Sequence, residues 1–245
     1  MARLSVNVNK IATVRNSRGG SVPSVLEAVK ACIAAGSPGI TVHPRGDARH
    51  ITAADVREIS THLRSLDGRV EYNIEGDPRP DLLDLVHEVR PHQCTLVPVR
   101  PGEITSQAGW SVDTPRATLG RVVSALKAHG IRVSLFVDPE DAPVRWAADL
   151  GADRVELYTE PFARAFERGA GDAMRSFETY TRVARLANSL GLGVNAGHDL
   201  DLDNLVLFRG LPHLDEVSIG HALISHAIFV GLGRSVREYL DVLAA

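Results

Sequence analysis

Ionisable side chains recur where short apolar runs of this sequence end. His43, Glu75 and His198 each close such a run, and Glu156 lies inside another. Histidine and glutamate together suit general acid–base catalysis, because burial and neighbouring charges can bring both pKa values near neutrality. For the two glutamates the alternative is a structural ion pair with an arginine, since an unpaired carboxylate is costly to bury. Their recurrence at the same end of successive runs favours one shared catalytic site.

A second set of residues suits the binding of anions. Arg18, Arg45 and His50 lie in polar stretches, and arginine and protonated histidine donate charge-assisted hydrogen bonds to phosphate. Gly220 and His221 stand where a strand is expected to pass into a short helix, whose first amides would face an anion. Solvated loop residues and a tight turn without a ligand are the alternatives. The set predicts a phosphate clamp beside the acid–base groups.

Strand-like runs alternate with longer segments of helical periodicity along the whole chain. Several of the runs are continuously apolar, as expected of parallel strands that are buried on both faces. The predicted strands are Leu4–Val8, Gly39–His43, Val70–Glu75, Gln93–Pro98, Arg132–Val137, Arg154–Thr159, Gly193–Gly197 and Glu216–Gly220.

This alternation predicts an α/β protein, a single (β/α)₈ TIM barrel over residues 1–245 with a short extra helix after the eighth strand. A doubly wound sheet is the competitor, but no G-x-G-x-x-G turn opens a helix after a strand. In a barrel, functional residues gather at the carboxyl ends of the strands. That rule places the histidines and glutamates together at the opening of the barrel formed by the carboxyl ends of the strands, called the mouth below.

Local signals predict where some helices begin. Thr52 with Asp55 has the spacing of a capping box, and Asp138-Pro139 has the pattern of an N-cap followed by a first-turn proline. Val99–Pro115 and Glu160–Ala173 are the longest irregular stretches, and both are predicted to be active-site loops.

Composition narrows the functional classes. The chain has 245 residues, 44% of them apolar, and 27 basic against 30 acidic residues give a net charge of −3. No large positive field exists to attract nucleic acid. No apolar run approaches the ~20 residues of a membrane-spanning helix, and the first ten residues do not resemble a signal peptide. With Cys32 and Cys94 in apolar stretches, we expect buried thiols in a cytoplasmic protein.

Other chemistries remain open on the same residues. A metal site could use His43, Glu75, Glu156 and His198, although no H-x-H or H-E-x-x-H spacing supports it. Lys10, at the end of the first strand, could form a Schiff base with a carbonyl substrate.

Six segments of the chain resemble the pyridoxine 5′-phosphate synthase family of vitamin B6 biosynthesis, in family order. They are Asn7-Val-Asn-Lys-Ile-Ala-Thr-Val-Arg-Asn-Ser-Arg-Gly19, Gly39-Ile-Thr-Val-His-Pro-Arg-Gly-Asp-Ala-Arg-His-Ile51, Asn73-Ile-Glu75, Pro91-His-Gln-Cys-Thr-Leu-Val-Pro98, Val194-Asn-Ala-Gly-His198 and Ser218-Ile-Gly-His-Ala222. The resemblance implies a TIM barrel. It also implies condensation of 1-deoxy-D-xylulose 5-phosphate with 3-amino-2-oxopropyl phosphate to pyridoxine 5′-phosphate, inorganic phosphate and water. No metal or other cofactor is implied, and neither nucleic acid nor a membrane is an expected partner. The implied assembly is a homo-octamer.

The resemblance also implies roles for individual residues. His43 and Glu75 match proton acceptors, His198 a proton donor, and Glu156 a carboxylate that stabilises the transition state. Contacts to the amino-ketone phosphate are implied for Asn7, Arg18, Gly220 and His221, and contacts to the deoxyxylulose phosphate for Arg45, His50 and Thr105. Substrate-contact positions are also occupied by Asn9, Lys10 and Asp199, where many members have Asp, His and Gly.

Two other functions stay open at this point. One is a metal-dependent sugar-phosphate isomerase or lyase on the same barrel, and the other is a barrel that binds phosphorylated metabolites without catalysis. Val99–Ser111, which contains Gly102, Thr105 and Gly109, is the candidate lid.

Overall fold

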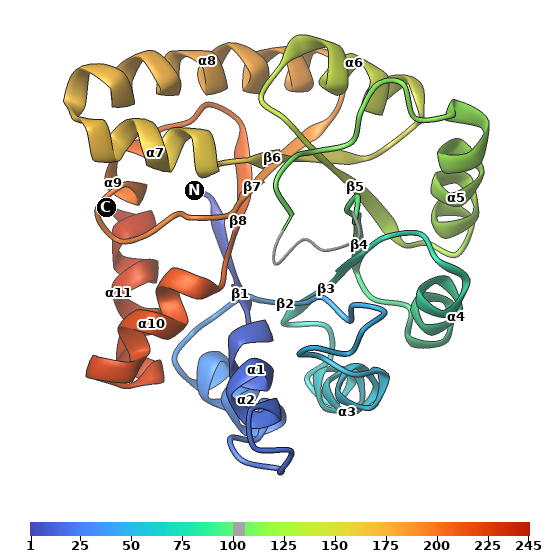
Figure 1. The fold of residues 1–245 in the computed structure, drawn as a ribbon, viewed down its shortest axis with the longest axis vertical. Coiled ribbons are helices and arrows are strands. Elements are labelled where there is room, and N and C mark those ends of the chain that lie inside the picture. Colours follow the sequence, from blue (N-terminus) through green and yellow to red (C-terminus); the bar gives the residue numbers. More distant parts are fainter. Residues whose placement is uncertain (100–105) are drawn as a thin grey trace.

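The computed structural model describes residues 1–99 and 106–245 of the chain. Eight parallel strands close into a barrel in chain order, with the first strand paired to the last, and helices surround it (Figure 1). This architecture confirms the predicted (β/α)₈ barrel. The strands are β1 (Arg3–Asn7), β2 (Gly39–Val42), β3 (Glu71–Gly76), β4 (Gln93–Leu96), β5 (Arg132–Val137), β6 (Arg154–Tyr158), β7 (Gly193–Gly197) and β8 (Leu214–Ile219).

The outer layer holds more helices than a minimal barrel needs. Two helices follow β1, β6 and β8, and the first helix after β8 confirms the predicted extra helix. The helices are α1 (Asn9–Asn16), α2 (Val25–Ala34), α3 (Ala53–Arg64), α4 (Pro80–Val89), α5 (Arg116–Ala128), α6 (Asp141–Asp149), α7 (Glu160–Arg168), α8 (Ala170–Ser189), α9 (Leu205–Phe208), α10 (His221–Val230) and α11 (Leu232–Ala244).

Of the two helix starts predicted from local signals, one is confirmed and one is wrong. The capping box of Thr52 and Asp55 forms as predicted at the start of α3. The predicted cap at Asp138-Pro139 is wrong, because α6 begins only at Asp141. Instead, the Asp138 side chain accepts a hydrogen bond from the Gly109 amide at 3.0 Å. It is therefore engaged by the segment after β4.

The predicted irregular loop at Glu160–Ala173 is also wrong. This segment forms α7 and the start of α8, separated by Gly169 at φ 123°. Arg164 pairs with Glu160 and Arg168 pairs with Asp172, each four residues apart. Such pairs stabilise helical turns on the exposed side of α7, and Phe162 and Phe166, four residues apart, form the apolar face that packs on the core.

The apolar core lies between the sheet and the helices. Leu4, Val6, Ile40 and Val42 point outward from their strands and join one cluster with helix residues such as Val29. Cys32 and Cys94 are free and buried, as predicted.

The inside of the barrel is polar, whereas bulky branched side chains fill most TIM barrels. Ser5 Oγ lies 2.7 Å from Thr41 Oγ1, and Asn73 Nδ2 donates to the same Thr41 oxygen at 3.4 Å. Thr95 Oγ1 continues this belt by donating to Asn73 Oδ1 at 3.1 Å. Each buried polar atom in this belt therefore has a partner on a neighbouring strand, which offsets its desolvation.

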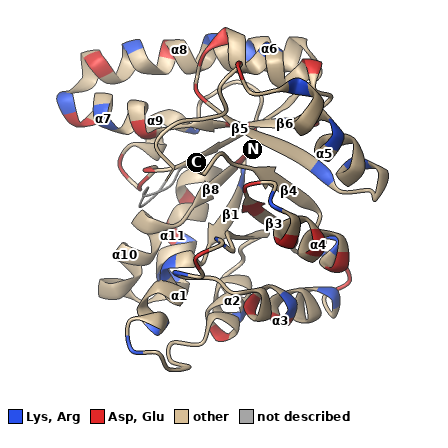
Figure 2. Cartoon of the chain, turned by 45° about the vertical axis from the view of Figure 1, so that its right-hand side comes forward, with Lys and Arg blue, Asp and Glu red and all other residues tan. Residues whose placement is uncertain are grey.

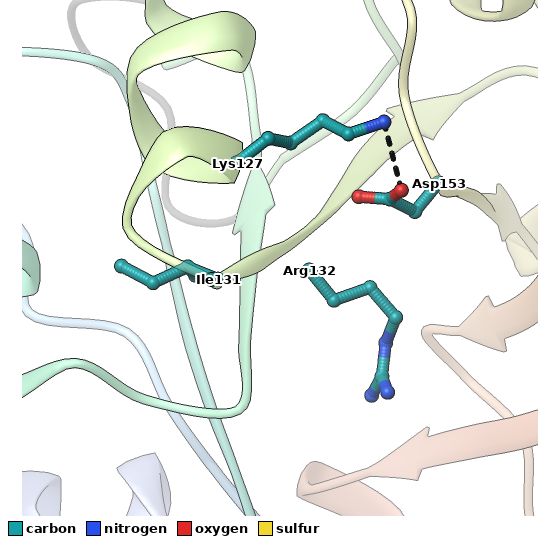
Figure 3. Close-up of a pocket in the computed structure, with 5 residues that line it drawn as sticks. Lys127, Ile131, Arg132 and Asp153 are labelled. Atoms are coloured by element: carbon teal, nitrogen blue, oxygen red, sulfur yellow. Dashed lines mark ion pairs between the residues drawn. The ribbon is translucent and has the colours of Figure 1, made fainter.

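The amino-terminal end of the barrel carries a separate charged network. Arg132 donates to Gln93 Oε1 at 2.9 Å and also pairs with Glu71. Beside it lies a shallow surface pocket of about 350 Å³ lined by Lys127, Gly130, Ile131, Arg132 and Asp153 (Figure 3). This pocket lies at the starts of β5 and β6, away from the carboxyl ends of the strands.

Candidate active site

Predicted acid–base residues gather at the carboxyl end of the barrel. His43 follows β2, Glu75 is near the end of β3, Glu156 is central in β6, and His198 follows β7. The two glutamates and His43 are buried, with exposed fractions of 7% for His43, 7% for Glu75 and 2% for Glu156. The fold thus brings side chains from distant strands to one mouth.

Glu75 is the centre of the contacts on one side of this mouth. Its Oε2 lies 3.9 Å from Nδ1 of His43 and accepts a hydrogen bond from Asn7 Nδ2 at 3.5 Å. Its Oε1 accepts from Ser218 Oγ at 3.4 Å. The Asn9 side chain accepts from the backbone amide of His43 at 2.9 Å, which ties the start of α1 to the end of β2.

Burial sets the protonation states of Glu75 and His43. It raises the pKa of Glu75 to about 8, the charge of Glu216 acts in the same direction, and the hydrogen bond from Ser218 opposes the shift. Burial also holds the pKa of His43 well below its usual value, helped by the charges of His50 and Arg45. At neutral pH the pair is a carboxylic acid beside a neutral imidazole. Within the described residues, Nε2 of His43 is buried without a hydrogen-bond partner.

Glu156 lies deeper and has a free oxygen. Its Oε2 is buried and has no hydrogen-bond partner in the described part of the chain. Burial raises its pKa well above the usual value, and the charges of Glu75 and Glu216 add to this effect. Room for the carboxylate comes from Gly197 on the neighbouring strand, where a Cβ atom would lie 2.4 Å from Glu156 Oε1.

His198 is held by aromatic rings and by an unusual backbone. Its ring centroid lies 5.0 Å from that of Phe136 and 5.5 Å from that of Tyr158, the latter edge-on. Its φ of 81° is in the left-handed region, which non-glycine residues adopt rarely and mostly at functional sites. The Thr159 hydroxyl donates to the carbonyl oxygens of Gly197 and His198, which fixes this turn. Burial lowers the pKa of His198.

Cationic groups lie beside the acid–base residues. Arg45 is buried, with an exposed fraction of 7%, and the His50 ring lies edge-on to His43 at 6.1 Å between centroids. Burial lowers the pKa of His50 to about 4, and the charges of Arg45 and Lys10 act in the same direction. Their positive field marks this side of the mouth as suited to an anion.

The other predicted binding residues divide into two groups. Gly220 caps α10 and lies against Asn7, because a Cβ atom on Gly220 would be 3.1 Å from the Asn7 side chain. Arg18, Asp199 and His221 are exposed. Thr105 lies outside the described residues, as does part of the candidate lid Val99–Ser111.

Comparison with known proteins places this barrel among its relatives. A family model described as "Pyridoxal phosphate biosynthesis protein PdxJ" matches residues 4–245. The chain belongs to the PdxJ family. It is 51% identical over 244 residues to the pyridoxine 5′-phosphate synthase of Christiangramia forsetii, covering 99% of this chain and 100% of the relative. It is 50% identical over 245 residues to the synthase of Porphyromonas gingivalis, with 100% of both chains covered.

Solved structures with little sequence identity share only the fold with this PdxJ family member. Phosphoribosyl anthranilate isomerase from Thermotoga maritima superposes with a TM-score of 0.62 at 13% identity, covering 100% of this chain and 99% of that one. The YdjI aldolase from Escherichia coli K12 gives a TM-score of 0.61 at 11% identity, covering 99% and 89%.

Three residues that act on this PdxJ-family site were not predicted. Glu216 is a buried glutamate inside β8 that accepts a hydrogen bond from Asn195 at 3.4 Å and is influenced by the charges of the arginines at the amino-terminal end of the barrel. Its charge raises the pKa values of Glu75 and Glu156, and the pattern that identified those two residues could have identified it. Phe136 and Tyr158 form a small apolar cluster with Val97, separate from the main core. No local signal distinguishes an inward-facing aromatic residue from an outward-facing one in a fully buried strand.

Neither a metal-binding cluster nor a membrane-spanning helix occurs in the described residues of this PdxJ family member. Within residues 1–99 and 106–245, no group of three or more His, Cys, Asp or Glu side chains is arranged to hold a metal ion. In the same ranges, no helix has the length and apolar character needed to cross a bilayer.

Proposed function

We propose that this chain condenses 1-deoxy-D-xylulose 5-phosphate with 3-amino-2-oxopropyl phosphate. The products are pyridoxine 5′-phosphate, inorganic phosphate and water. The observation that carries the proposal is full-length identity of about half with proteins named pyridoxine 5′-phosphate synthase. Relatives this similar share more than a fold, because about half of the residues are identical over nearly the full length of both chains.

Ring formation from these two substrates needs a series of proton transfers, and we assign them to His43, Glu75, Glu156 and His198. His43 is the first acceptor, since a neutral imidazole with an unpartnered buried nitrogen can take a proton from a bound substrate. Glu75 holds its proton near neutral pH and becomes an acceptor once that proton is lost. A group with its pKa near the working pH can perform both halves of such an exchange.

Glu156 and His198 are assigned to the opposite side of the mouth. The free oxygen of Glu156 faces no competing donor among the described residues, so it is available to accept a hydrogen bond from an iminium N–H. Positive charge developing on that nitrogen would also favour the ionised carboxylate over the neutral acid that burial alone favours. His198 is the proton donor for the departing oxygen, and the rings of Phe136 and Tyr158 orient it. All of these steps use side chains of the protein, with no metal and no other cofactor.

Two phosphate groups require two anion sites. We place the deoxyxylulose phosphate at Arg45, His50 and Thr105, and the amino-ketone phosphate at Arg18, Gly220, His221 and Asn7. Asn9, Lys10 and Asp199 line the substrates between these sites. The first site is supported by the buried guanidinium of Arg45 next to His50, and the second by the close approach of Gly220 to Asn7 at the start of α10.

We further propose that the chain assembles with copies of itself, as a homo-octamer, in the cytoplasm. Helix α10 contains no Lys, Arg, Asp or Glu (Figure 2), and it exposes 73% of Ile228 and 87% of Phe229. Apolar surface of this kind is typical of contacts between subunits. The free buried cysteines fit a reducing compartment.

One assay tests the proposed reaction. Purified protein is mixed with both substrates in the presence of EDTA, and pyridoxine 5′-phosphate and inorganic phosphate are followed in parallel. Appearance of the two products in equal amounts supports the proposal. Product that forms only after a divalent metal is restored would replace it with a metal-dependent mechanism. Tight binding of both substrates without turnover would indicate a barrel that binds metabolites and does not transform them.

A further inference from the structure

Two side chains at the end of α1 hold the segment that carries Arg45 and His50. Asn16 Nδ2 donates to the backbone oxygen of His50 at 2.9 Å and approaches that of Ala48 at 3.5 Å. Arg15 Nη2 donates to the same His50 oxygen at 3.3 Å. Arg15 Nε also donates to Asn16 Oδ1 at 2.9 Å, which orients the amide of Asn16.

Arg15 is itself anchored to the helix that follows this segment. Its guanidinium is bidentate on Asp55, through Nη1 to Oδ1 and through Nη2 to Oδ2 at 2.9 Å. Asp55 is buried and closes the capping box of α3 with Thr52. Burial opposes ionisation of Asp55, but hydrogen bonds from Arg15 and Thr52 outweigh it and lower its pKa. The bidentate pair holds the Arg15 guanidinium in one orientation, which the ammonium group of a flexible lysine side chain would not do.

The same helix holds the other end of the segment. At the start of α1, the Asn9 side chain accepts from the His43 amide at 2.9 Å. Helix α1 therefore holds both ends of the segment 43–50. Asn9 contacts His43 at its start, and Arg15 and Asn16 contact His50 at its end. Arg45 lies between these two contacts, in a stretch that includes Ala48 at φ 51° and has no regular secondary structure.

We propose that Arg15 and Asn16 are positioning residues that hold residues 43–50 in the shape that presents Arg45 and His50 to a phosphate monoester. Identification of that ligand as the sugar phosphate rests on the proposed function. Neither residue contacts the phosphate. They act by removing alternative conformations of the segment before the ligand arrives, so their loss weakens binding at this site and leaves the other phosphate site unchanged.

Asn16→Leu is the main test variant, since it removes the amide but keeps the branched shape and the number of heavy atoms, adds no charge and changes a partly exposed residue. Arg15→Lys is the second, because it keeps the charge beside Asp55 but cannot reach two acceptors with one planar group. Arg57→Gln is the matched control: it removes an arginine from α3 that pairs only with exposed Glu88 in the described structure.

Steady-state kinetics should separate the two substrates. We expect each test variant to raise the KM for deoxyxylulose phosphate about tenfold, with the KM for the amino ketone and the kcat within about twofold, as for lost preorganisation of one subsite. Arg57→Gln should match the wild type. Equal changes in both KM values, or a lower melting temperature with unchanged KM values, would overturn the proposal.

Hydrogen exchange tests the positioning without relying on turnover. Amides of residues 46–51 should exchange about tenfold faster in Asn16→Leu than in the wild type, and inorganic phosphate should bind more weakly by titration calorimetry. If the wild type forms no product, the proposed function fails while these two measurements still decide the role of Arg15 and Asn16. Unchanged exchange and phosphate affinity would refute that role.

Discussion

A Cβ atom at Gly197 would lie 2.4 Å from Oε1 of Glu156, so β7 leaves the space that the carboxylate on β6 occupies. The fold tolerates a Cβ atom here, because the contact is with the end of a flexible side chain and not with backbone, but the carboxylate of Glu156 would have to give way. Any side chain at this position must move Glu156.

Gly197→Ala is therefore expected to displace Glu156 without unfolding the barrel. A misplacement of about 1 Å near reacting atoms costs roughly 10²-fold in rate, so kcat should fall by about that factor. Gly120→Ala in α5, where a Cβ would meet Leu150 at an ordinary 3.5 Å, is the control and should keep full activity. Assays of kcat and melting temperature on both variants decide this, and an active Gly197→Ala enzyme would contradict it.

The raised pKa of Glu75 predicts a pH dependence of stability. Its folded pKa of about 8 exceeds the ordinary 4.5, so the folded protein keeps a proton that the unfolded chain releases between these values. This contribution to stability is complete below pH 4.5 and is lost as pH rises toward 8. Glu75→Gln stays neutral at every pH. The unfolding free energy of Glu75→Gln relative to the wild type should therefore increase from pH 5 to pH 8 and then level off.

Urea denaturation of the two proteins at several pH values measures this difference. Arg57→Gln serves as the control and should follow the wild type at every pH, because its side chain is exposed. A constant difference between Glu75→Gln and the wild type across this range would show that Glu75 ionises normally in the folded protein.

The aromatic contacts to His198 predict that two substitutions at Tyr158 have different effects on kcat. Tyr158→Phe keeps the edge-on ring at 5.5 Å, whereas Tyr158→Leu removes it and lets the imidazole change orientation. We expect kcat to stay within about twofold for Phe and to fall about tenfold for Leu, with KM values nearly constant in both. Steady-state kinetics measures this. If kcat falls equally in both variants, the tyrosine hydroxyl and not the aromatic ring is the group that orients His198.

The exposed apolar residues of α10 predict that the proposed oligomer forms through this helix. Replacement of Ile228 and Phe229 by lysine should lower the mass of the assembly in sedimentation or light scattering, because desolvating the introduced charges opposes association. Val206→Lys, at a residue of α9 that is 55% exposed, is the control. An unchanged mass for the double variant would place the subunit contact elsewhere on the surface.

Much of the barrel could be predicted from local patterns. Predicted strands β5 and β7 match the structure in both bounds, and the capping box at Thr52 forms, because each depends on residues that are neighbours in sequence. The two errors have different causes. Asp138 had the local chemistry of a helix cap, but the amide of Gly109, 29 residues away, takes its carboxylate. Glu160–Ala173 does carry a helical signal, because Phe162 and Phe166 are four residues apart and Phe162 is buried, so this helix could have been predicted from the sequence.

Patterns within single segments were enough to predict the alternation of strands and helices, the family, and the end of the barrel where ionisable residues collect. Which of these residues meet depends on the folded barrel. Glu75 lies against Asn7 and Ser218, which are 68 and 143 residues away, and Arg15 meets Asp55 across 40 residues. These contacts, and the burial that moves the pKa values of His43 and Glu75, exist only once the barrel closes. Closure depends on the summed packing of all the strands, which no local segment specifies.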